Sequence, residues 1–480
     1  MNKGDLIRLN VERYAFEGKG IARIDGELNP EISEDDSFIV FVNGAYPGDK
    51  VSAKIKKIKK SYAEAIVDEI ISPSPKRVHP RCKYFGSCGG CKQQDLSYEQ
   101  QIAYKQEQVE DIFKHNGGFS DLSANKAGFK IEEILPSKKV FYYRNKMEFS
   151  FSDMQWLTEK EMETEIRRNF VLGLHVPNVY DKILDVEECF LQSEVSTGIL
   201  NFTRDFFQQN KSTIYSTKTH TGYLRNLVIR QSQNTNDLMI NLVTSEENES
   251  LLKKYVSKIT EKFPEITTII NNINKKKSSV GVGDYEIVYH GSGYIYDKIG
   301  DYKFRISANS FFQTNTLQAE KLYGIALEYA ELNGNEVIYD LYSGAGTIAI
   351  FVSKFAREVY GFEAVESSIF DANANLEINE VKNVKFVQAD LYKTFLPFTE
   401  TLPKPDIIIL DPPRSGMHKN TVDDVLKLSP EKIVYASCNP TTQVRDIQLM
   451  VEDGYKLIKI RPVDMFPHTY HIENVALLLK

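Results

Sequence analysis

Short runs of alternating apolar and polar residues, separated by glycines, occupy the first part of the chain, residues 1–71. A period of two places the apolar side chains on one face of a strand, and the turns between runs join neighbouring strands. The pattern therefore predicts a small β-barrel over residues 1–71. Pro73, Pro75 and Pro80 follow it and mark a boundary, because proline lacks a backbone donor and stiffens the chain.

The pattern changes after this boundary. From Ser97 to Lys114 apolar and charged residues recur at helical spacing, which predicts a helix. Residues 130–300 are rich in predicted strands, and we expect residues 76–300 to form one central domain.

In the last segment, residues 301–480, strands alternate with helices from about residue 308, which is typical of a parallel α/β sheet. The expected strands are Glu336–Leu341, Glu358–Glu363, Val384–Gln388, Ile407–Leu410, Lys432–Ala436, Tyr455–Ile460 and Glu473–Leu479. The predicted fold class is α/β, with a seven-stranded, doubly wound Rossmann-like domain whose ligands bind at the carboxyl ends of the strands.

Length and composition indicate an ordinary soluble protein. A chain of 480 residues with 42% hydrophobic content can bury a large core and should hold roughly two to four domains. The N-terminus has no apolar signal segment, and no stretch approaches the roughly 18 apolar residues that span a bilayer. We therefore expect a cytoplasmic protein with no membrane partner.

The net charge narrows the choice of partners. Non-specific binding to nucleic acid depends on Lys and Arg that neutralise phosphates, and the formal charge here is -7. This balance argues against a protein that coats nucleic acid, and DNA is not an expected partner. Local basic runs at Lys54–Lys60 and Lys275–Lys277 allow a specific contact, although such runs are more often solvated faces. No pattern sets the oligomeric state, and we expect a monomer.

A glycine-rich segment, from Asp340 through Gly344 and Gly346 to Thr347, follows the first strand of the last domain and precedes an apolar helical run. Glycines let backbone approach a ligand at a helix N-terminus, and Glu363 at the end of the next strand is placed to accept both hydroxyls of a ribose. The segment lacks the third glycine of a dinucleotide site and a phosphate-binding lysine. The pattern favours S-adenosylmethionine over NAD, ATP or a purely structural turn.

Two further strand ends carry reactive side chains. Asp411 is followed by two prolines, which force the chain out of the sheet at its ligand-binding edge. The next strand ends at Cys438, a thiol that would otherwise be a small buried hydrophobe. A thiolate beside a methyl donor can add to C6 of a uracil and activate C5, after which a base must remove the C5 proton. Glu473, which opens the last strand, is the candidate base.

The remaining cysteines form a second group. Cys82, Cys88 and Cys91 lie in one glycine-rich loop, and Cys189 lies further along. Five cysteines are too few and too unevenly placed for a disulfide scaffold, so reduced thiols are expected. Four thiolates suit either zinc or an iron–sulfur cluster, and spacing does not separate these from unliganded thiols.

The catalytic motifs resemble those of the class I S-adenosylmethionine-dependent RNA uracil-5-methyltransferases, and the whole chain resembles the 23S rRNA branch of that family. The matching motifs are Ser310-Phe-Phe-Gln313-Thr-Asn, Asp340-Leu-Tyr-Ser-Gly-Ala-Gly, Asp411-Pro-Pro-Arg, Ser437-Cys438-Asn-Pro and His471-Ile-Glu473. The resemblance implies a cofactor pocket lined by Gln313, Tyr342, Glu363 and Asp411. It also implies that Cys438 is the nucleophile and Glu473 the proton acceptor. Thr347 stands where some members carry asparagine, and it is a weaker cofactor candidate.

The resemblance has further implications for the rest of the chain. It implies a [4Fe-4S] cluster on Cys82, Cys88, Cys91 and Cys189, and a TRAM domain, a small RNA-binding barrel, over residues 1–71. It also places Arg144, Asn145 and Lys146 in a motif that contacts RNA. Because we expect the transfer-RNA branch to lack the barrel, 23S rRNA is the expected substrate. The alternatives are a tRNA uracil-5-methyltransferase and a non-catalytic RNA-binding or ribosome-assembly protein.

Overall fold

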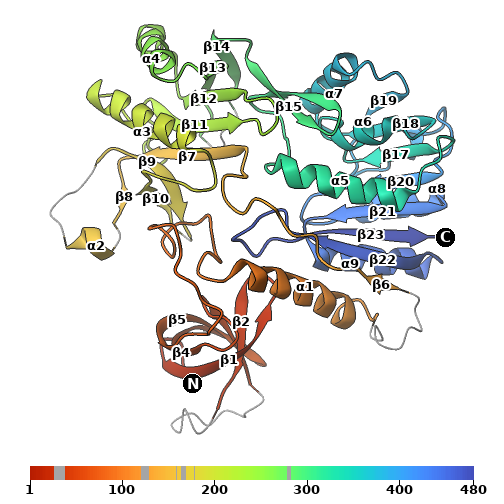
Figure 1. Cartoon of the computed structure of the whole chain (residues 1–480), viewed down its shortest axis with the longest axis horizontal. Helices are drawn as coiled ribbons and strands as arrows, with labels where there is room; N and C mark the ends of the chain where they lie inside the picture. The colour runs from red at the N-terminus through yellow and green to blue at the C-terminus, as the bar shows by residue number, and fades with distance from the viewer. Residues whose placement is uncertain (26–37, 120–128, 158, 164–168, 178, 278–282) are drawn as a thin grey trace.

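A closed barrel and two larger sheets organise the chain (Figure 1). The structure, a computed structural model, describes residues 1–25, 38–119, 129–157, 159–163, 169–177, 179–277 and 283–480. No helix within these ranges is long and apolar enough to cross a membrane.

The N-terminal barrel has five strands in the order β1-β2-β3-β5-β4, which confirms the predicted barrel. Its strands are β1 (Leu6–Ala15), β2 (Lys19–Arg23), β3 (Ile39–Asn43), β4 (Lys50–Ile58) and β5 (Tyr62–Ser72). Alternate residues of β1 and β4 are buried, as the period of two requires. Side chains such as Ile7, Val40 and Val51 fill the interior.

Helix α1 (Tyr98–His115) connects the barrel to the rest of the molecule and confirms the predicted helix. Ser97 caps it by accepting a hydrogen bond from the Gln100 amide. The helix lies between the barrel and the C-terminal sheet (Figure 1). Tyr14 and Tyr46 of the barrel pack with Leu96 and with Tyr104 of α1 in a small buried cluster, which fixes the barrel on the helix.

The central sheet has eight strands in the order β14-β13-β12-β11-β7-β9-β10-β8. They are β7 (Lys146–Ser152), β8 (Gln155–Trp156), β9 (Val171–Val176), β10 (Val179–Asp185), β11 (Leu224–Gln231), β12 (Leu238–Thr244), β13 (Thr268–Ile273) and β14 (Tyr285–His290), with helices α2 (Glu159–Met162), α3 (Glu194–Gln209) and α4 (Glu249–Lys262). Aromatic rings of α3 and α4, among them Phe207 and Tyr255, pack on this sheet.

The C-terminal sheet has the order β19-β18-β17-β20-β21-β23-β22-β6. Its strands are β17 (Val337–Leu341), β18 (Glu358–Glu363), β19 (Val384–Gln388), β20 (Ile407–Leu410), β21 (Lys432–Ser437), β22 (Lys456–Val463), β23 (Glu473–Leu479) and β6 (Lys130–Ile131). The helical elements are α5 (Thr316–Ala330), α6 (Thr347–Ser353), α7 (Glu366–Ile378), η1 (Leu396–Phe398), α8 (Lys419–Leu428) and α9 (Pro440–Glu452), and a hairpin of β15 (Tyr294–Ile299) and β16 (Tyr302–Ser307) precedes them.

The seven predicted strands are all present, and the prediction of a seven-stranded sheet needs one correction. An eighth strand, β6, pairs in parallel with β22 through Lys130 and Lys459. Two residues are too few to show a period, so the sequence pattern gave no sign of it. Strand β23 runs antiparallel between β21 and β22, which brings Glu473 back to the edge where Cys438 lies.

Candidate active site

The glycine-rich loop after β17 takes left-handed backbone at three positions, with φ of 67° at Tyr342, 54° at Gly344 and 79° at Gly346. Gly346 is required for packing, since a Cβ there would lie 2.4 Å from Phe386 Cζ. Around Gly344 no heavy atom of the described residues comes within 4 Å of such a Cβ, so this backbone faces open space. A strained tyrosine beside an open glycine is typical of a ligand site.

Glu363, at the end of β18, ties this loop to the next one. Its Oε2 accepts a hydrogen bond from the Gly344 amide at 3.0 Å, and its Oε1 accepts one from the Val365 amide at 2.8 Å. Each oxygen keeps a free lone pair. The carboxylate is therefore held in place and can still accept hydrogen bonds from two ribose hydroxyls.

Two buried oxygen atoms beside the loop, one on Asp340 and one on Ser343, have no hydrogen-bond partner among the described residues. Asp340 Oδ2 accepts a hydrogen bond from the Ala349 amide at 3.1 Å, whereas Asp340 Oδ1 and Ser343 Oγ are buried and have no partner among the described residues. Burial raises the pKa of Asp340 well above its ordinary value, and the nearby Asp411 adds to this effect. Such orphaned groups fit a bound ligand that supplies donors, as S-adenosylmethionine would.

Three neighbouring strands bring Asp411, Cys438 and Glu473 together. Ser437 pairs with Asn474 across β21 and β23, so Cys438 and Glu473 stand opposite each other at the next position of the ladder. Leu410 of β20 pairs with Tyr435 of β21, which places Asp411 beside the same strand end. The predicted convergence of the thiol with two carboxylates at the ligand-binding edge is present in the structure.

The carboxylates shape the electrostatics of this site. Burial raises the pKa of the Cys438 thiol to about 12, with further contributions from Glu473 and Asp411, while Arg414 acts in the opposite direction. Burial also raises the pKa of Asp411 to about 7, and that of Glu473 well above its ordinary value. The thiol therefore carries its proton at neutral pH until a positive charge or an acceptor enters the pocket.

Arg414 and His471 belong to the site, although the sequence reasoning gave them no role. Arg414 donates to His471 Nδ1 at 2.6 Å, and both line the cavity beside Cys438. Burial lowers the pKa of His471 to about 4, with Arg414 adding to the effect, so the ring is neutral. Arg414 lies in the motif that begins at Asp411, and His471 lies in the motif that ends at Glu473. Their place in these motifs could have indicated that they belong to the site.

Gln313 lies shortly before α5, and Thr347 is the first residue of α6. Gln313 is half-buried at the start of the turn into α5, and its carbonyl accepts a hydrogen bond from Asn145 Nδ2 at 2.8 Å. The Thr347 hydroxyl lies 3.1 Å from the Tyr323 hydroxyl. Thr347 thus has a protein partner already, which suits its place as the weaker cofactor candidate.

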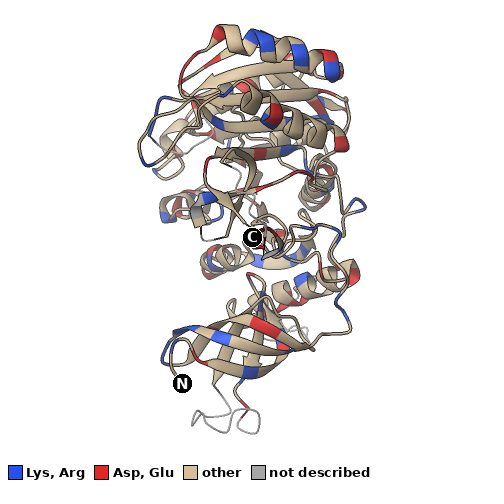
Figure 2. Ribbon diagram, turned by 90° about the vertical axis from the view of Figure 1, so that its left-hand side faces the viewer, with Lys and Arg blue, Asp and Glu red and all other residues tan. Residues whose placement is uncertain are grey.

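The three residues predicted to contact RNA differ in their surroundings. Asn145 is only 6% exposed, and its amide also donates to Thr316 Oγ1 at 2.9 Å. It offers RNA little surface and instead holds the loop that carries Gln313. Arg144 and Lys146 are half-buried at the start of β7 and keep part of their surface accessible. Figure 2 shows basic and acidic residues interspersed on the side facing the viewer.

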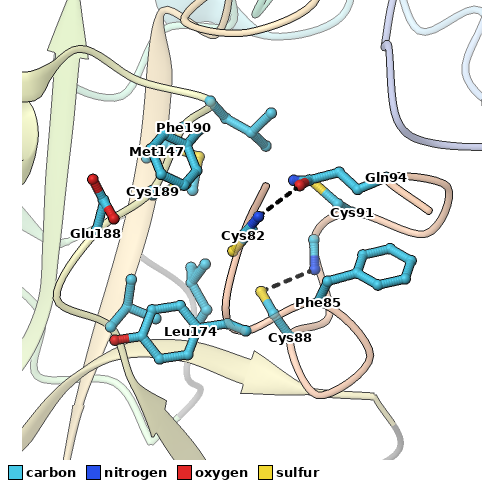
Figure 3. A pocket seen from close by; sticks show the side chains of 14 residues that line it. Cys82, Phe85, Cys88, Cys91, Gln94, Met147, Leu174, Glu188, Cys189 and Phe190 are labelled. Carbon is cyan, nitrogen blue, oxygen red and sulfur yellow. Dashed lines mark hydrogen bonds between the residues drawn. The ribbon is translucent and has the colours of Figure 1, made fainter. Parts of the chain in front are cut away.

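The other four cysteines line one cavity (Figure 3). Cys82, Cys88 and Cys91 come from the loop after the barrel, and Cys189 comes from the segment after β10. The side chain of Gln94 accepts a hydrogen bond from the Cys82 amide at 3.1 Å and donates one to Cys91 Sγ at 3.2 Å.

Burial raises the pKa of Cys91 to about 12 and that of Cys189 to about 11, and neighbouring thiols add to both shifts. Within the described ranges, no three Cys, His, Asp or Glu side chains are arranged to hold one metal ion. The structure thus places four thiols around one cavity. The iron–sulfur cluster expected on them stays a prediction.

The fold is that of a class I methyltransferase, with the candidate site residues at the carboxyl ends of the strands of a doubly wound sheet. A model of the tRNA (Uracil-5-)-methyltransferase family matches residues 231–393 and 402–480, and a model of the TRAM domain matches residues 2–67. The chain belongs to this family of S-adenosylmethionine-dependent RNA (uracil-C5) methyltransferases. The alternative of a non-catalytic assembly protein thereby loses its basis.

Relatives of similar length support the assignment. A protein of Chlorobaculum tepidum named as an uncharacterized RNA methyltransferase is 41% identical over 99% of this chain and 96% of its own length. A protein of Bacteroides thetaiotaomicron with the same description is 42% identical over 97% of this chain and 99% of its own.

Among solved structures, the tRNA (uracil-54, C5)-methyltransferase of Pyrococcus abyssi, in complex with S-adenosyl-L-homocysteine, is similar throughout. The TM-score is 0.73 at 28% identity, and the match covers 98% of this chain and 100% of that one. Because 98% coverage includes the barrel, the expectation that a tRNA enzyme lacks this domain was wrong. The barrel by itself does not separate rRNA from tRNA substrates.

Proposed function

We propose that this protein transfers a methyl group from S-adenosylmethionine to C5 of one specific uridine in 23S rRNA, through a covalent bond between Cys438 Sγ and C6 of the base. The observation that carries the proposal is the meeting of Cys438, Asp411 and Glu473 at three neighbouring strand ends, beside the glycine loop. A thiol, a base and a methyl-donor pocket are the parts that this chemistry needs.

The first steps follow from the chemistry of the thiol. Cys438 Sγ gives its proton to solvent water and bonds to C6, and the electrons of the C5–C6 double bond move onto O4 as an enolate. When bound, S-adenosylmethionine supplies an electrophilic methyl group on a positively charged sulfur. That charge favours the thiolate, which offsets the effects of burial, Glu473 and Asp411 on the pKa of Cys438. C5 then forms its bond to the methyl carbon as the carbon–sulfur bond breaks.

Glu473 completes the cycle in this proposal. As a carboxylate it takes the proton from C5, the electron pair of that C5–H bond forms the C5–C6 double bond, and the C6–sulfur bond breaks so that Cys438 leaves as a thiolate. The antiparallel pairing that sets Glu473 opposite Cys438 supports this role, because both groups must reach the same edge of one ring. Gln313, Tyr342, Gly344, Gly346, Glu363 and Asp411 would hold the methyl donor, with Thr347 at the edge of the set.

Two RNA classes are candidates for the substrate. Ribosomal RNA is supported by the resemblance of the four-cysteine loop and the catalytic motifs to those of the 23S rRNA enzymes. Transfer RNA is supported by the similarity of the fold to the tRNA (uracil-54, C5)-methyltransferase of Pyrococcus abyssi. In both cases the uracil must leave its stack to reach the thiol, and Arg144 and Lys146 would help to hold the opened strand. We infer a monomer that works in the cytoplasm.

One experiment tests the reaction and the substrate together. The full-length protein is incubated with labelled S-adenosylmethionine and either 23S rRNA or bulk tRNA from a strain that lacks the gene, and 5-methyluridine is mapped. We expect one uridine of 23S rRNA to be labelled, and labelling of tRNA alone would overturn the rRNA assignment. Glu473→Gln should accumulate a denaturation-resistant protein–RNA adduct. Methylation that survives in Cys438→Ala would overturn the covalent mechanism.

We also propose that Cys82, Cys88, Cys91 and Cys189 hold a [4Fe-4S] cluster. An all-sulfur donor set around one cavity fits such a cluster, and the backbone and amide donors of Gly90 and Gln94 that reach two of the sulfurs would stabilise negative charge on thiolates. A bound cluster would tie the loop after the barrel to the central sheet. The methyl transfer itself requires no redox step.

Purification without oxygen tests the cluster. We expect a brown protein that contains iron and sulfide, and Cys189→Ser should lose both while Cys438→Ser keeps them. Colourless protein with one equivalent of zinc would show that the four thiols hold a different metal.

A further inference from the structure

The cavity beside Cys438 is lined by residues from both ends of the chain. It encloses about 220 Å³, and its walls are Phe16, Glu17, Arg414, Cys438, Asn439, Tyr470, His471 and Ile472. Phe16 and Glu17 belong to the turn between β1 and β2 of the barrel. We propose that this turn is part of the active site, and that Glu17 is a specificity-determining residue that accepts a hydrogen bond from an N–H group of an RNA base held beside the target uridine.

The barrel holds this turn against the catalytic domain. Tyr14 lies two residues before Phe16, is 7% exposed, and packs against Tyr46 and Tyr104 at ring-centroid distances of 5.6 and 5.1 Å. Its hydroxyl accepts a hydrogen bond from Gln93 Nε2 at 2.9 Å. Phe16 then packs against the hydrophobic core of the C-terminal sheet. Apolar contacts on both sides therefore fix where the turn lies.

The backbone conformation of the turn also fixes its position against the cavity wall. A Cβ at Gly18 would lie 2.9 Å from Tyr470 Cδ1, so only glycine lets the turn rest on this ring of the cavity wall. Gly18 has φ of 79°, and Glu17 before it has φ of 65°. A glutamate held in left-handed backbone costs free energy, and such residues cluster at ligand sites. The structure keeps Glu17 in this conformation among the residues that line the cavity.

The chemistry of the cavity points to a base as the group that Glu17 contacts. Glu17 is exposed, and within the described ranges its carboxylate has no ion pair. A carboxylate only accepts hydrogen bonds and repels phosphate, whereas the N–H groups of base edges donate them. Arg414, which also lines the cavity, donates and is positive. The cavity thus offers one acceptor for a base edge and one cation for the RNA backbone.

This inference rests on the proposed Cys438 chemistry and adds a role for the barrel to it. The barrel would read one nucleotide at the reaction centre in addition to holding RNA at a distance. Specificity would then depend on a residue at the opposite end of the chain from the nucleophile.

Steady-state methylation of the RNA class that the wild-type protein modifies tests the proposal, with the full-length protein throughout. Glu17→Ala should lower kcat/KM by about tenfold or more, the size expected for one lost hydrogen bond to a charged group. Glu17→Gln keeps a hydrogen-bond acceptor, so its kcat/KM should lie between those of the wild-type protein and Glu17→Ala. The matched control is Glu12→Ala, which removes an exposed carboxylate from β1 of the same barrel, paired only loosely with Arg23 at 3.9 Å, and should leave kcat/KM unchanged.

A second measurement separates recognition from folding. Stem-loop substrates carry each of the four nucleotides in turn on either side of the target uridine. The wild-type protein should prefer one neighbour, and Glu17→Ala should reduce that preference while binding S-adenosyl-L-homocysteine normally. Wild-type kcat/KM and undiminished preference in Glu17→Ala would overturn the proposal. If Glu17→Ala does not fold, Glu17→Gln decides between the same two outcomes. A wild-type protein that methylates no RNA contradicts the proposed function instead, and needs no variant to show it.

Discussion

Lys105 and Asp464 form an ion pair inside the protein, with Lys105 Nζ 2.5 Å from Asp464 Oδ1 and neither side chain exposed to solvent. Lys105 also donates to the Phe466 carbonyl at 3.2 Å, and the Tyr98 hydroxyl donates to Asp464 Oδ2 at 2.7 Å. Helix α1 thus holds the segment before β23, which leads to His471 and Glu473. The helix that docks the barrel also positions the catalytic segment.

Removal of one partner of this pair should be strongly destabilising. Lys105→Met leaves the Asp464 carboxylate buried without its cation, which costs about 3–5 kcal/mol of unfolding free energy. The double variant Lys105→Met/Asp464→Leu should recover much of this loss. Urea denaturation measures both. Lys253→Ala is the control, since its partner Glu249 and Lys253 itself are 69% and 68% exposed, and it should not change stability measurably. A double variant as unstable as the single one would contradict the prediction.

The reactivity of Cys438 should respond in opposite directions to two neighbouring charges. Since Asp411 raises the pKa of the thiol and Arg414 lowers it, Asp411→Asn should speed alkylation of Cys438 and Arg414→Gln should slow it. Only the thiolate reacts, so the wild-type rate should rise about tenfold per pH unit while the pH stays below about 12. Iodoacetamide labelling of the Cys438 peptide, followed by mass spectrometry at pH 8 to 9 without cofactor, measures all three rates. Shifts of the same sign in both variants would contradict this electrostatic picture.

Glu363 should contribute to binding of the methyl donor. Glu363→Ala removes the acceptor that holds the Gly344 amide and that is proposed to bind the ribose, and it should raise the Kd for S-adenosyl-L-homocysteine by about tenfold to a hundredfold. Calorimetric titration measures this change. Glu336 is a fitting control, because it accepts the Asn333 and Gly334 amides at the other end of the sheet. Equal effects of Glu336→Ala and Glu363→Ala would indicate general loss of stability rather than loss of a ligand contact.

Asn145 and Arg144 are neighbours that should have separable roles. Asn145→Ala leaves the Gln313 carbonyl and the Thr316 hydroxyl without their donor, which should cost about 1–3 kcal/mol of stability and weaken cofactor binding. Arg144→Ala should weaken RNA binding and leave cofactor affinity unchanged. Calorimetry with S-adenosyl-L-homocysteine and filter binding with 23S rRNA distinguish these effects. If Asn145→Ala affected only RNA binding, the positioning role of Asn145 would be wrong.

Local patterns predicted much of the fold. The strands Glu358–Glu363, Val384–Gln388, Ile407–Leu410 and Glu473–Leu479 have the predicted bounds, because each is an apolar run with clear breaks at both ends. The helix after Ser97 was predicted for the same reason, because its N-cap and its helical spacing of apolar residues both lie within one short segment. Strand β6, with two residues, shows no period and was missed.

The candidate site was predicted in part. Asp411 and Cys438 each follow a parallel strand, so the rule that ligands bind at the carboxyl ends of such strands was enough to bring them together. Glu473 begins an antiparallel strand, and it was a candidate because the chemistry requires a base and because the resemblance implies one there. Asn145 was predicted to contact RNA, whereas its burial against the Gln313 loop depends on how two domains pack. No pattern in the sequence expresses that contact.

The sequence by itself determined where the strands lie along the chain, and it identified the glycine-rich loop, Cys438 and the candidate carboxylates Asp411 and Glu473. Each of these depends on spacing within a short segment. Only the tertiary structure decided that Lys105 supports the segment that leads to Glu473, and that Glu17 of the barrel lines the same cavity as Cys438. Each of these contacts joins residues far apart in the chain. Their formation depends on the packing of whole domains through buried side chains such as Tyr14 and Phe16, and such packing leaves no local period to read.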